Sequence, residues 1–171
     1  IEMDELKFDR IVSTNIRQIG FERTMLEVIY PFLDKLSLMW LTGSIVLAQE
    51  NFISNLIRQK IIVAIDSLPH SAGRTCNKFF VYLPEGDMQE LSILFMHYLI
   101  KCRGNQVVYL GQNISTNDLV DAYQISKPNY IFTMITETYA NKPVQQYVDQ
   151  LSESFPEANI LLSGYQVVAQ D

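Results

Sequence analysis

Histidine and cysteine are both scarce in this sequence, which has two of each among 171 residues. Cys76 and Cys102 have neither metal-ligand spacing nor a third partner, which argues against a zinc site or a disulfide framework and favours free thiols in a reducing cytosol. His70 lies in a segment rich in turn residues, whereas His97 lies inside an expected helix, where we expect a packing or solvent-facing role. No nucleophile with a base, metal cluster or phosphate-binding glycine loop is recognisable, so we do not expect an enzyme.

Positive charge and long apolar runs are also lacking. The chain has 13 Lys and Arg against 19 Asp and Glu, a formal charge of −6, and no basic run longer than two residues. Binding to a nucleic-acid backbone needs clustered Lys and Arg, so this part of the protein is not expected to hold DNA by itself. No apolar run approaches the roughly 18 residues that a membrane span needs, and no signal peptide is recognisable, which predicts a cytoplasmic protein that does not enter a membrane.

The first part of the chain has apolar residues at helical spacing, which predicts a small helical bundle. Gly20 should end the first helix, and Pro31 should kink the second because it removes a backbone hydrogen bond. Ser44 is the expected N-cap of the third helix. Because the sequence starts at Ile1, already inside a helical pattern, we interpret it as a fragment that continues toward the N-terminus. The three expected helices span residues 4–18, 22–40 and 45–68.

The rest of the chain alternates short apolar runs with helical segments, the pattern of an open parallel sheet. Ligands bind such sheets beyond the carboxyl ends of the strands, so the loops after Leu83, Leu110 and Ile135 are the expected binding loops. The pattern stops one helix, or one helix and a strand, short of a five-stranded sheet. The expected strands are residues 78–83, 105–110, 130–135 and 159–163; the expected helices are 89–103, 117–125 and one opened by Asn141 and Pro143; a loop is expected after residue 163.

Two segments add a more specific pattern to this plan. One is the turn in which Trp40 precedes Glu50 and Asn51, and the other is the loop after the first strand, which contains Asp87 and Gln89. A helical bundle followed by a parallel sheet, with these segments in this order, resembles the C-terminal cobalamin-binding, CarH-like sensor region of MerR-family transcriptional regulators. The resemblance covers essentially the whole chain. It implies an α/β protein with a helical cap domain at 1–68, a linker at 69–77, and a Rossmann-like, flavodoxin-like domain at 78–171.

In that family an acid-x-His-x-x-Gly motif follows the first strand. The histidine is the axial ligand beneath cobalt, the acid orients its imidazole, and the glycine gives room to the nucleotide tail of the cofactor. Asp87 matches the acid, but Gln89 stands in the place of the axial histidine and Ser92 in the place of the glycine. A neutral carboxamide is a poor substitute for imidazole on cobalt. Apart from the resemblance, Asp87 is also a natural cap for the helix that follows it.

The family also carries a tryptophan in the helical bundle with a Glu-His pair ten residues later, and this tryptophan shields the upper face of the corrin. Trp40 and Glu50 match, Asn51 replaces the histidine, and Leu41 stands where the family has its light-state upper ligand. The residues alone support a plainer interpretation as well. A single tryptophan in an apolar bundle is often a core or interface residue, and a glutamate on a long helix is often a solvated charge.

Two further sites follow from the same resemblance. Thr133 and Ile135 take the places of a small-x-apolar site after the third strand. Gly164 and Tyr165 take the places of a glycine pair that lines the nucleotide tail, and the phenol of Tyr165 would enter that space.

The resemblance implies a ligand-sensing and oligomerisation region of a MerR-like regulator that lacks the axial histidine. Its ligand would be cobalamin or another small molecule, its partner a second copy in a dimer or tetramer, and DNA would be bound only by an N-terminal part absent from this sequence. Two other hypotheses stay open. One is a corrinoid carrier for methyl transfer, against which the loss of the axial histidine argues, and the other is a ligand-free dimerisation module whose former pocket is filled by side chains such as Tyr165.

Overall fold

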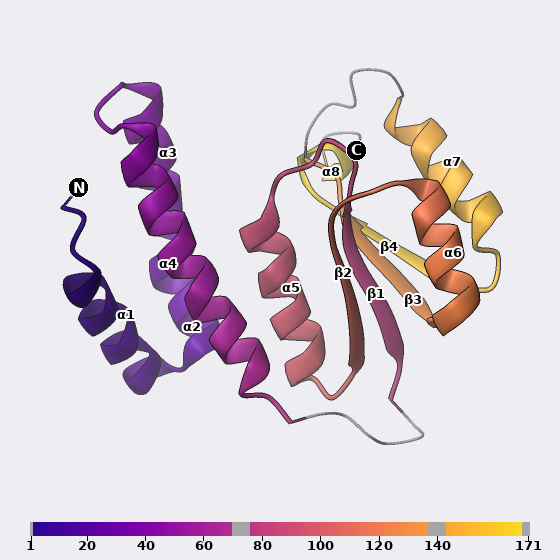
Figure 1. Ribbon diagram of the computed structural model, residues 1–171, viewed down its shortest axis with the longest axis horizontal. Coiled ribbons are helices and arrows are strands. Elements are labelled where there is room, and N and C mark those ends of the chain that lie inside the picture. The colour runs from indigo at the N-terminus through magenta and orange to yellow at the C-terminus, as the bar shows by residue number, and fades with distance from the viewer. Residues whose placement is uncertain (1, 70–75, 137–142, 169–171) are drawn as a thin grey trace. The chain divides into compact units, whose positions relative to one another are not determined.

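The computed structural model describes residues 2–69, 76–136 and 143–168. It divides into two compact units, Ile1–Ser67 and Leu68–Asp171, which we call the helical unit and the sheet unit. Figure 1 draws the helical unit from indigo to magenta and the sheet unit from pink to yellow. Most of the expected linker at 69–77, with His70, lies outside the described residues.

The helical unit contains the three predicted helical segments. Asp4 caps the first helix, because its side chain accepts the Lys7 backbone N–H at 2.9 Å. Gly20, with φ of 83°, separates this helix from the next, as predicted. Lys60 of the last helix pairs with Asp9 of the first. The elements are α1 (Glu5–Ile19), α2 (Phe21–Thr24), the π-helix η1 (Met25–Ile29), α3 (Tyr30–Leu41) and α4 (Leu47–Asp66).

Pro31 disturbs the second helical segment without interrupting it. The segments α2, η1 and α3 follow one another directly, and the π-helical turn comes just before the proline. Within that turn the Tyr30 N–H donates to the Met25 carbonyl, five residues back. Proline has no N–H to continue the regular ladder and crowds the preceding turn, which gives the local change of winding a physical reason.

The prediction that Ser44 caps the third helix is wrong. The helix α4 begins at Leu47, and Val46 holds the N-cap position, where its N–H donates to the Gln49 side chain at 3.0 Å. The Ser44 hydroxyl instead lies 2.8 Å from the hydroxyl of Thr42. Ser44 therefore stabilises the turn between α3 and α4, and the side chain of Gln49 stabilises the start of α4.

Among its described residues the sheet unit has four parallel strands in the order β2-β1-β3-β4, which confirms the predicted open parallel sheet. A chain that returns to the far side of β1 after β2 makes the switch point at which such folds bind ligands. The elements are β1 (Lys78–Pro84), α5 (Glu90–Cys102), β2 (Gln106–Ile114), α6 (Thr116–Ser126), β3 (Tyr130–Met134), α7 (Val144–Ser154), β4 (Asn159–Ser163) and α8 (Tyr165–Val168).

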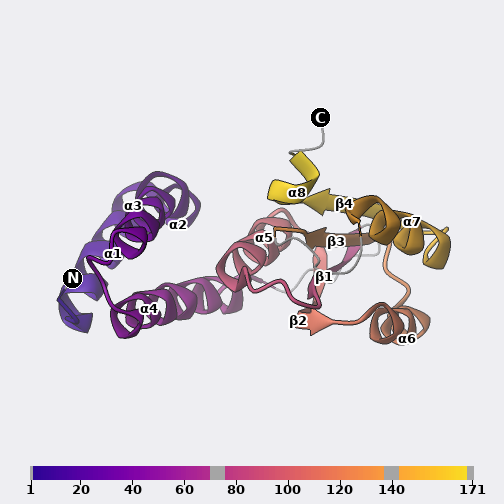
Figure 2. The same ribbon diagram turned by 90° about the horizontal axis from the view of Figure 1, so that it is seen from above.

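Two cores cover the two faces of this sheet, because side chains along a strand alternate between its faces. Figure 2 shows α5 on one side and α6 and α7 on the other. On the α5 side, β1 contributes Val81 and Leu83, which pack with Ile93. On the opposite side, β1 contributes Phe80 and Tyr82 to a larger cluster that also contains Leu119, Ile131, Ile135, Tyr147, Leu151 and Phe155.

Two predicted loops are regular structure. The strand β2 does not end at Leu110 but continues to Ile114, because register shifts let Gly111 pair with Tyr82 and Ile114 pair with Pro84. Glycine suits this place because its φ is 91°. The residues after β4 form the short helix α8 where a loop was predicted. At the start of α7, Pro143 holds the N-cap position, and Asn141 lies outside the described residues.

Candidate functional site

The carboxylate of Asp87 joins the carboxyl ends of β1 and β3. Its residue is 1% exposed, and one of its oxygens accepts the N–H of Gln89 at 3.1 Å. The other oxygen accepts both the N–H and the hydroxyl of Thr136, each at 2.7 Å. A buried carboxylate needs such donors, and hydrogen bonds to a charged group are stronger than neutral ones. Asp87 therefore fixes the β1–α5 loop directly before α5.

Thr136 is the site residue that the sequence did not single out. It directly follows Ile135 at the end of β3, so its place beyond a strand end is the signal that could have identified it. A single threonine gives no indication from sequence that it meets an acid 49 residues away.

Gln89, in the place of the axial histidine, lies at the N-cap of α5 and is exposed. Its side chain makes no capping hydrogen bond to the helix. Ser92 is half-buried in the first turn of α5. The loop after β1 thus keeps a firmly held acid but presents a carboxamide at the position where the resemblance calls for an imidazole.

His97 lies inside α5 and packs against the sheet. Its ring stacks on Tyr109 of β2, with 5.5 Å between ring centroids, and its Nδ1 is buried without a hydrogen-bond partner. Burial, together with the charge of Lys101, lowers the pKa of His97 to about 4, so the imidazole is neutral at neutral pH. The expectation of a packing role is confirmed, and His97 does not serve the loop after β1.

The end of β3 is held within the protein as well. Thr133 is fully buried, and its hydroxyl donates to the Tyr82 carbonyl at 2.9 Å, so it links β3 to β1. Ile135 is fully buried in the core on the α6 and α7 side. Both side chains that the resemblance assigns to this site are therefore occupied by contacts inside the sheet unit.

Gly164 lies against the backbone of Ile135. A Cβ at Gly164 would be 2.4 Å from the Ile135 carbonyl oxygen, and the glycine has φ of 105°. Two backbone hydrogen bonds hold the two segments at this distance. The Ile135 N–H donates to the Ser163 carbonyl at 2.8 Å, and the Gln166 N–H donates to the Ile135 carbonyl at 3.1 Å. The absence of a side chain at Gly164 is thus required by the packing of the chain on itself.

Tyr165 begins α8 and is 73% exposed, so its phenol lies at the surface. Met88, in the loop after β1, and Val168, at the end of α8, are exposed too. Because the carboxyl ends of parallel strands share one edge of a sheet, these residues belong to the same edge of the sheet unit. We call Met88, Tyr165 and Val168 the edge residues.

The helical unit exposes apolar side chains around the turn between α3 and α4. Trp40 is 45% exposed, so it is not a core residue of its own unit. Glu50 is half-buried and Asn51 is exposed, both near the start of α4. Large apolar residues are seldom left in solvent together unless they meet a ligand or partner. We define the turn patch as Leu38, Trp40, Leu41, Val46 and Leu47, all of which are exposed.

The donor set does not fit a cobalt ion ligated by the protein. Within residues 2–69, 76–136 and 143–168, no group of three or more His, Cys, Asp or Glu side chains could hold a metal ion. The one imidazole of these residues belongs to His97, which is packed between α5 and β2.

In the same described ranges, no helix is long and apolar enough to cross a membrane.

Part of the chain matches a known protein family. Residues 1–64 match the model of the family described as "B12 binding domain". The HTH-type transcriptional repressor CarH of Myxococcus xanthus is 25% identical over 126 residues, which are 74% of this chain. The chain spans only 40% of the length of that relative.

Two solved structures resemble the whole chain at low identity. One is a novel cobalamin-binding protein from Desulfitobacterium hafniense DCB-2, at 16% identity and a TM-score of 0.46, covering 98% of this chain and 82% of that one. The other is the methanol:cobalamin methyltransferase complex MtaBC from Methanosarcina barkeri, at 14% identity and a TM-score of 0.47, covering 98% of this chain and 67% of that one. The helical unit is therefore similar to the family described as "B12 binding domain", and in this chain it is followed by an open parallel sheet.

Proposed function

We propose that this chain is the ligand-sensing and oligomerisation region of a MerR-like transcriptional regulator, related to cobalamin sensors but without their axial histidine. One observation carries the proposal: the similarity to the CarH repressor extends over 126 residues, more than the helical unit contains, and so includes part of the sheet unit. DNA would be bound by a further part of the regulator, because this chain is acidic, with a formal charge of −6.

The ligand would be held by apolar contact without a bond from the protein to a metal. The turn patch offers exposed apolar area for such contact within the helical unit. A corrinoid bound in this way would keep its own base on cobalt or have no lower ligand, since Gln89 cannot replace an imidazole. Its chemistry when bound would be that of the free corrinoid, and the role of this chain would be to bind it and exclude water.

A ligand that covers the turn patch would change the surface through which two copies associate. Such a ligand shifts the equilibrium between monomer and assembly only by its difference in affinity for the two states. Coupling to DNA would follow if dimers or tetramers bind an operator more tightly than monomers. The region would then act as a sensor without catalysing a reaction.

A second candidate is a ligand-free dimerisation module. The specific observation in its favour is that Leu41 and Gln89, which stand where cobalamin sensors have axial ligands, are both exposed and carry no imidazole. In this case the turn patch would be covered by a second copy of the chain. A corrinoid carrier for methyl transfer is less favoured, because cobalt cycling in such carriers normally uses the ligand that Gln89 replaces.

The experiment that tests the proposal is a binding and assembly measurement in the dark. The purified chain is incubated with adenosyl-, methyl- or hydroxocobalamin, desalted, and analysed by absorbance and size-exclusion chromatography. We expect retained corrinoid absorbance and an elution volume that changes with the ligand. Trp40→Ala should reduce retention, whereas the matched change Val63→Ala, at an exposed residue of α4 outside the turn patch, should not.

The outcomes separate the candidates. A colourless protein that elutes as a dimer with and without ligand supports the ligand-free module. Turnover of methylcobalamin with a thiol acceptor supports the carrier. A colourless monomer under every condition contradicts all three.

A further inference from the structure

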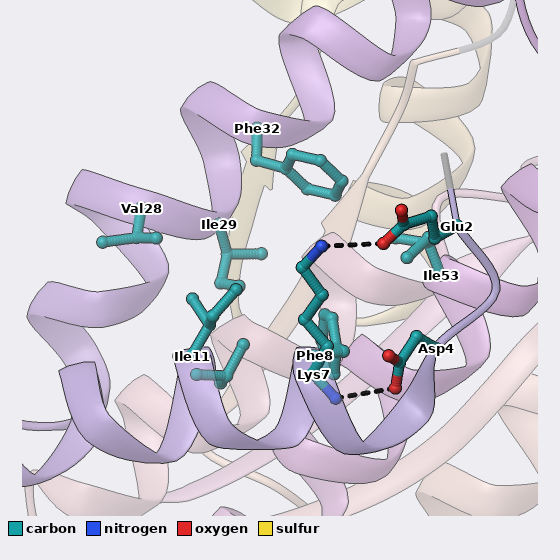
Figure 3. Close-up of a pocket in the computed structure, with 10 residues that line it drawn as sticks. Glu2, Asp4, Lys7, Phe8, Ile11, Val28, Ile29, Phe32 and Ile53 are labelled. Atoms are coloured by element: carbon teal, nitrogen blue, oxygen red, sulfur yellow. Dashed lines mark hydrogen bonds and ion pairs between the residues drawn. The ribbon is translucent and has the colours of Figure 1, made fainter.

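A pocket of about 270 Å³ opens on the surface of the helical unit, and no residue of the turn patch lines it. Figure 3 shows its apolar side chains, which come from α1, η1, α3 and α4. None of the residues that the resemblance assigns to a corrinoid lines it. Its lining consists of Glu2, Asp4, Lys7, Phe8, Ile11, Val12, Val28, Ile29, Phe32 and Ile53.

The π-helical turn forms one wall of the pocket. Val28 and Ile29 belong to η1, and Phe32 follows in the first turn of α3. Turns of this kind are rare and are found frequently at functional sites. The turn whose winding Pro31 changes is therefore part of the pocket wall.

Charged groups stand only at the mouth. Lys7 donates from its ammonium to Glu2 at 2.7 Å and from its backbone N–H to Asp4 at 2.9 Å (Figure 3). Glu2 raises the pKa of Lys7 and Lys7 lowers the pKa of Glu2, so both stay charged at neutral pH. Two carboxylates and one ammonium leave the mouth with a formal charge of −1, which disfavours an anion.

We propose that this pocket binds a small neutral or cationic molecule with an apolar, preferably aromatic, body and one polar end. The apolar wall with two phenylalanines, Phe8 and Phe32, would hold the body, and the acidic mouth would face the polar end. An enclosed apolar cavity of about 150 Å³ is enough to hold benzene, and this pocket, which is larger but open to solvent on one side, has room for a molecule of about ten non-hydrogen atoms. It is too small for a corrin ring, so the site does not depend on the function proposed above.

A matched series of probes tests the class of ligand. The chain without cobalamin is titrated with 3-phenylpropan-1-ol, 3-phenylpropylamine and 3-phenylpropionate, which share a body and differ in the charge of the end group. Backbone amide shifts are followed by nuclear magnetic resonance. We expect the alcohol and the amine to bind more tightly than the carboxylate, with shift changes confined to residues 2–12, 28–32 and 53.

Variants test the location. Val28→Phe fills the pocket and should raise the Kd of the alcohol at least about tenfold, which corresponds to about 1.4 kcal/mol. The matched control Val63→Phe, at an exposed residue of α4 outside the pocket, should leave it unchanged. If Val28→Phe unfolds the chain, Ile11→Phe serves instead, because Ile11 lines the pocket and is 51% exposed.

A second pair of variants tests the role of the charged groups at the mouth of the pocket. Glu2→Gln should weaken the amine relative to the alcohol, whereas Glu5→Gln, on α1 but outside the lining, should not. Absence of pocket shifts with all three probes at millimolar concentration overturns the proposal. Pocket shifts that follow protein concentration and not probe concentration also overturn it, since they would assign the pocket to a second copy of the chain.

Discussion

Replacing Gly164 by alanine should destabilise the sheet unit far more than a glycine-to-alanine change normally does. Two costs add at this position. Alanine at a positive φ costs about 1–2 kcal/mol, and the φ of Gly164 is 105°. In addition, the new Cβ would be 2.4 Å from the Ile135 carbonyl oxygen, so the loops after β3 and β4 must separate. Loss of the two backbone hydrogen bonds that join these loops costs about 1 kcal/mol each.

Gly104 provides the matched control. It also has a positive φ, of 81°, but a Cβ there meets nothing within 4 Å. Gly104→Ala should therefore cost about 1–2 kcal/mol and Gly164→Ala about 3–4 kcal/mol. For a domain of about 100 residues, this difference of about 2 kcal/mol corresponds to about 8–16 °C in Tm.

The assay is thermal and urea unfolding without any ligand, followed by far-ultraviolet circular dichroism. The single tryptophan, Trp40, lies in the helical unit, so its fluorescence reports that unit separately. We expect Gly164→Ala to change the circular dichroism transition by much more than Gly104→Ala does. Equal losses of stability in the two variants would refute the argument that close backbone approach requires this glycine.

Three further predictions concern the loop after β1 and the α5 face. Thr136→Val removes one donor from the buried carboxylate of Asp87 and should lower the free energy of unfolding by about 1.5–3 kcal/mol in urea titrations; an unchanged midpoint would contradict the role of this hydrogen bond. Because folding lowers the pKa of His97 from 6.5 to about 4, the unfolded chain binds more protons between these values and stability should fall as pH drops from 6.5 to 4. His97→Gln should make this loss of stability with falling pH smaller. Parallel profiles of stability against pH for the two proteins would show that His97 does not cause the loss. Gln89→His places an imidazole two residues after Asp87 and should increase retained cobalamin, with histidine-nitrogen coupling in the electron paramagnetic resonance spectrum of the cobalt(II) form; a spectrum of base-on cobalamin alone would count against this.

The parts of the fold that depend on local pattern could be predicted from the sequence. Short apolar runs predicted β1, β3 and β4 to within one residue. For β1 and β3 the reason is burial, because a strand buried on both faces is apolar throughout. The end of β2 could not be predicted, since Gly111 and Asn113 are typical turn residues. They stay in the strand because register shifts against β1 accommodate their positive φ values.

The contacts that set the candidate site depend on distant residues and were not predictable. Thr136 meets Asp87 across 49 positions, and the tight approach of Gly164 to Ile135 exists only once β3 and β4 are paired. The prediction of the N-cap of α4 was wrong for a local reason. Ser44 is a good cap by residue type, but its hydroxyl pairs with Thr42, and the Gln49 side chain satisfies the start of α4 instead.

The residues that match the cobalamin-sensor pattern and those that depart from it differ in what they do for the fold. In the sheet unit the matching residues Asp87, Thr133 and Gly164 are all required by contacts inside the unit. Of the departing residues, Gln89 and Tyr165 are exposed and Ser92 is half-buried.

A match in the sheet unit is therefore explained by folding alone and is weak evidence for a corrinoid. Trp40 is the exception, because it matches the pattern although it is 45% exposed and no part of the core of its own unit. Folding does not account for an exposed tryptophan among the other apolar residues of the turn patch, and contact with a ligand or a second copy does. For this reason the response of Trp40→Ala in binding and assembly, more than any change in the sheet unit, distinguishes a sensor from a fold that has lost its ligand.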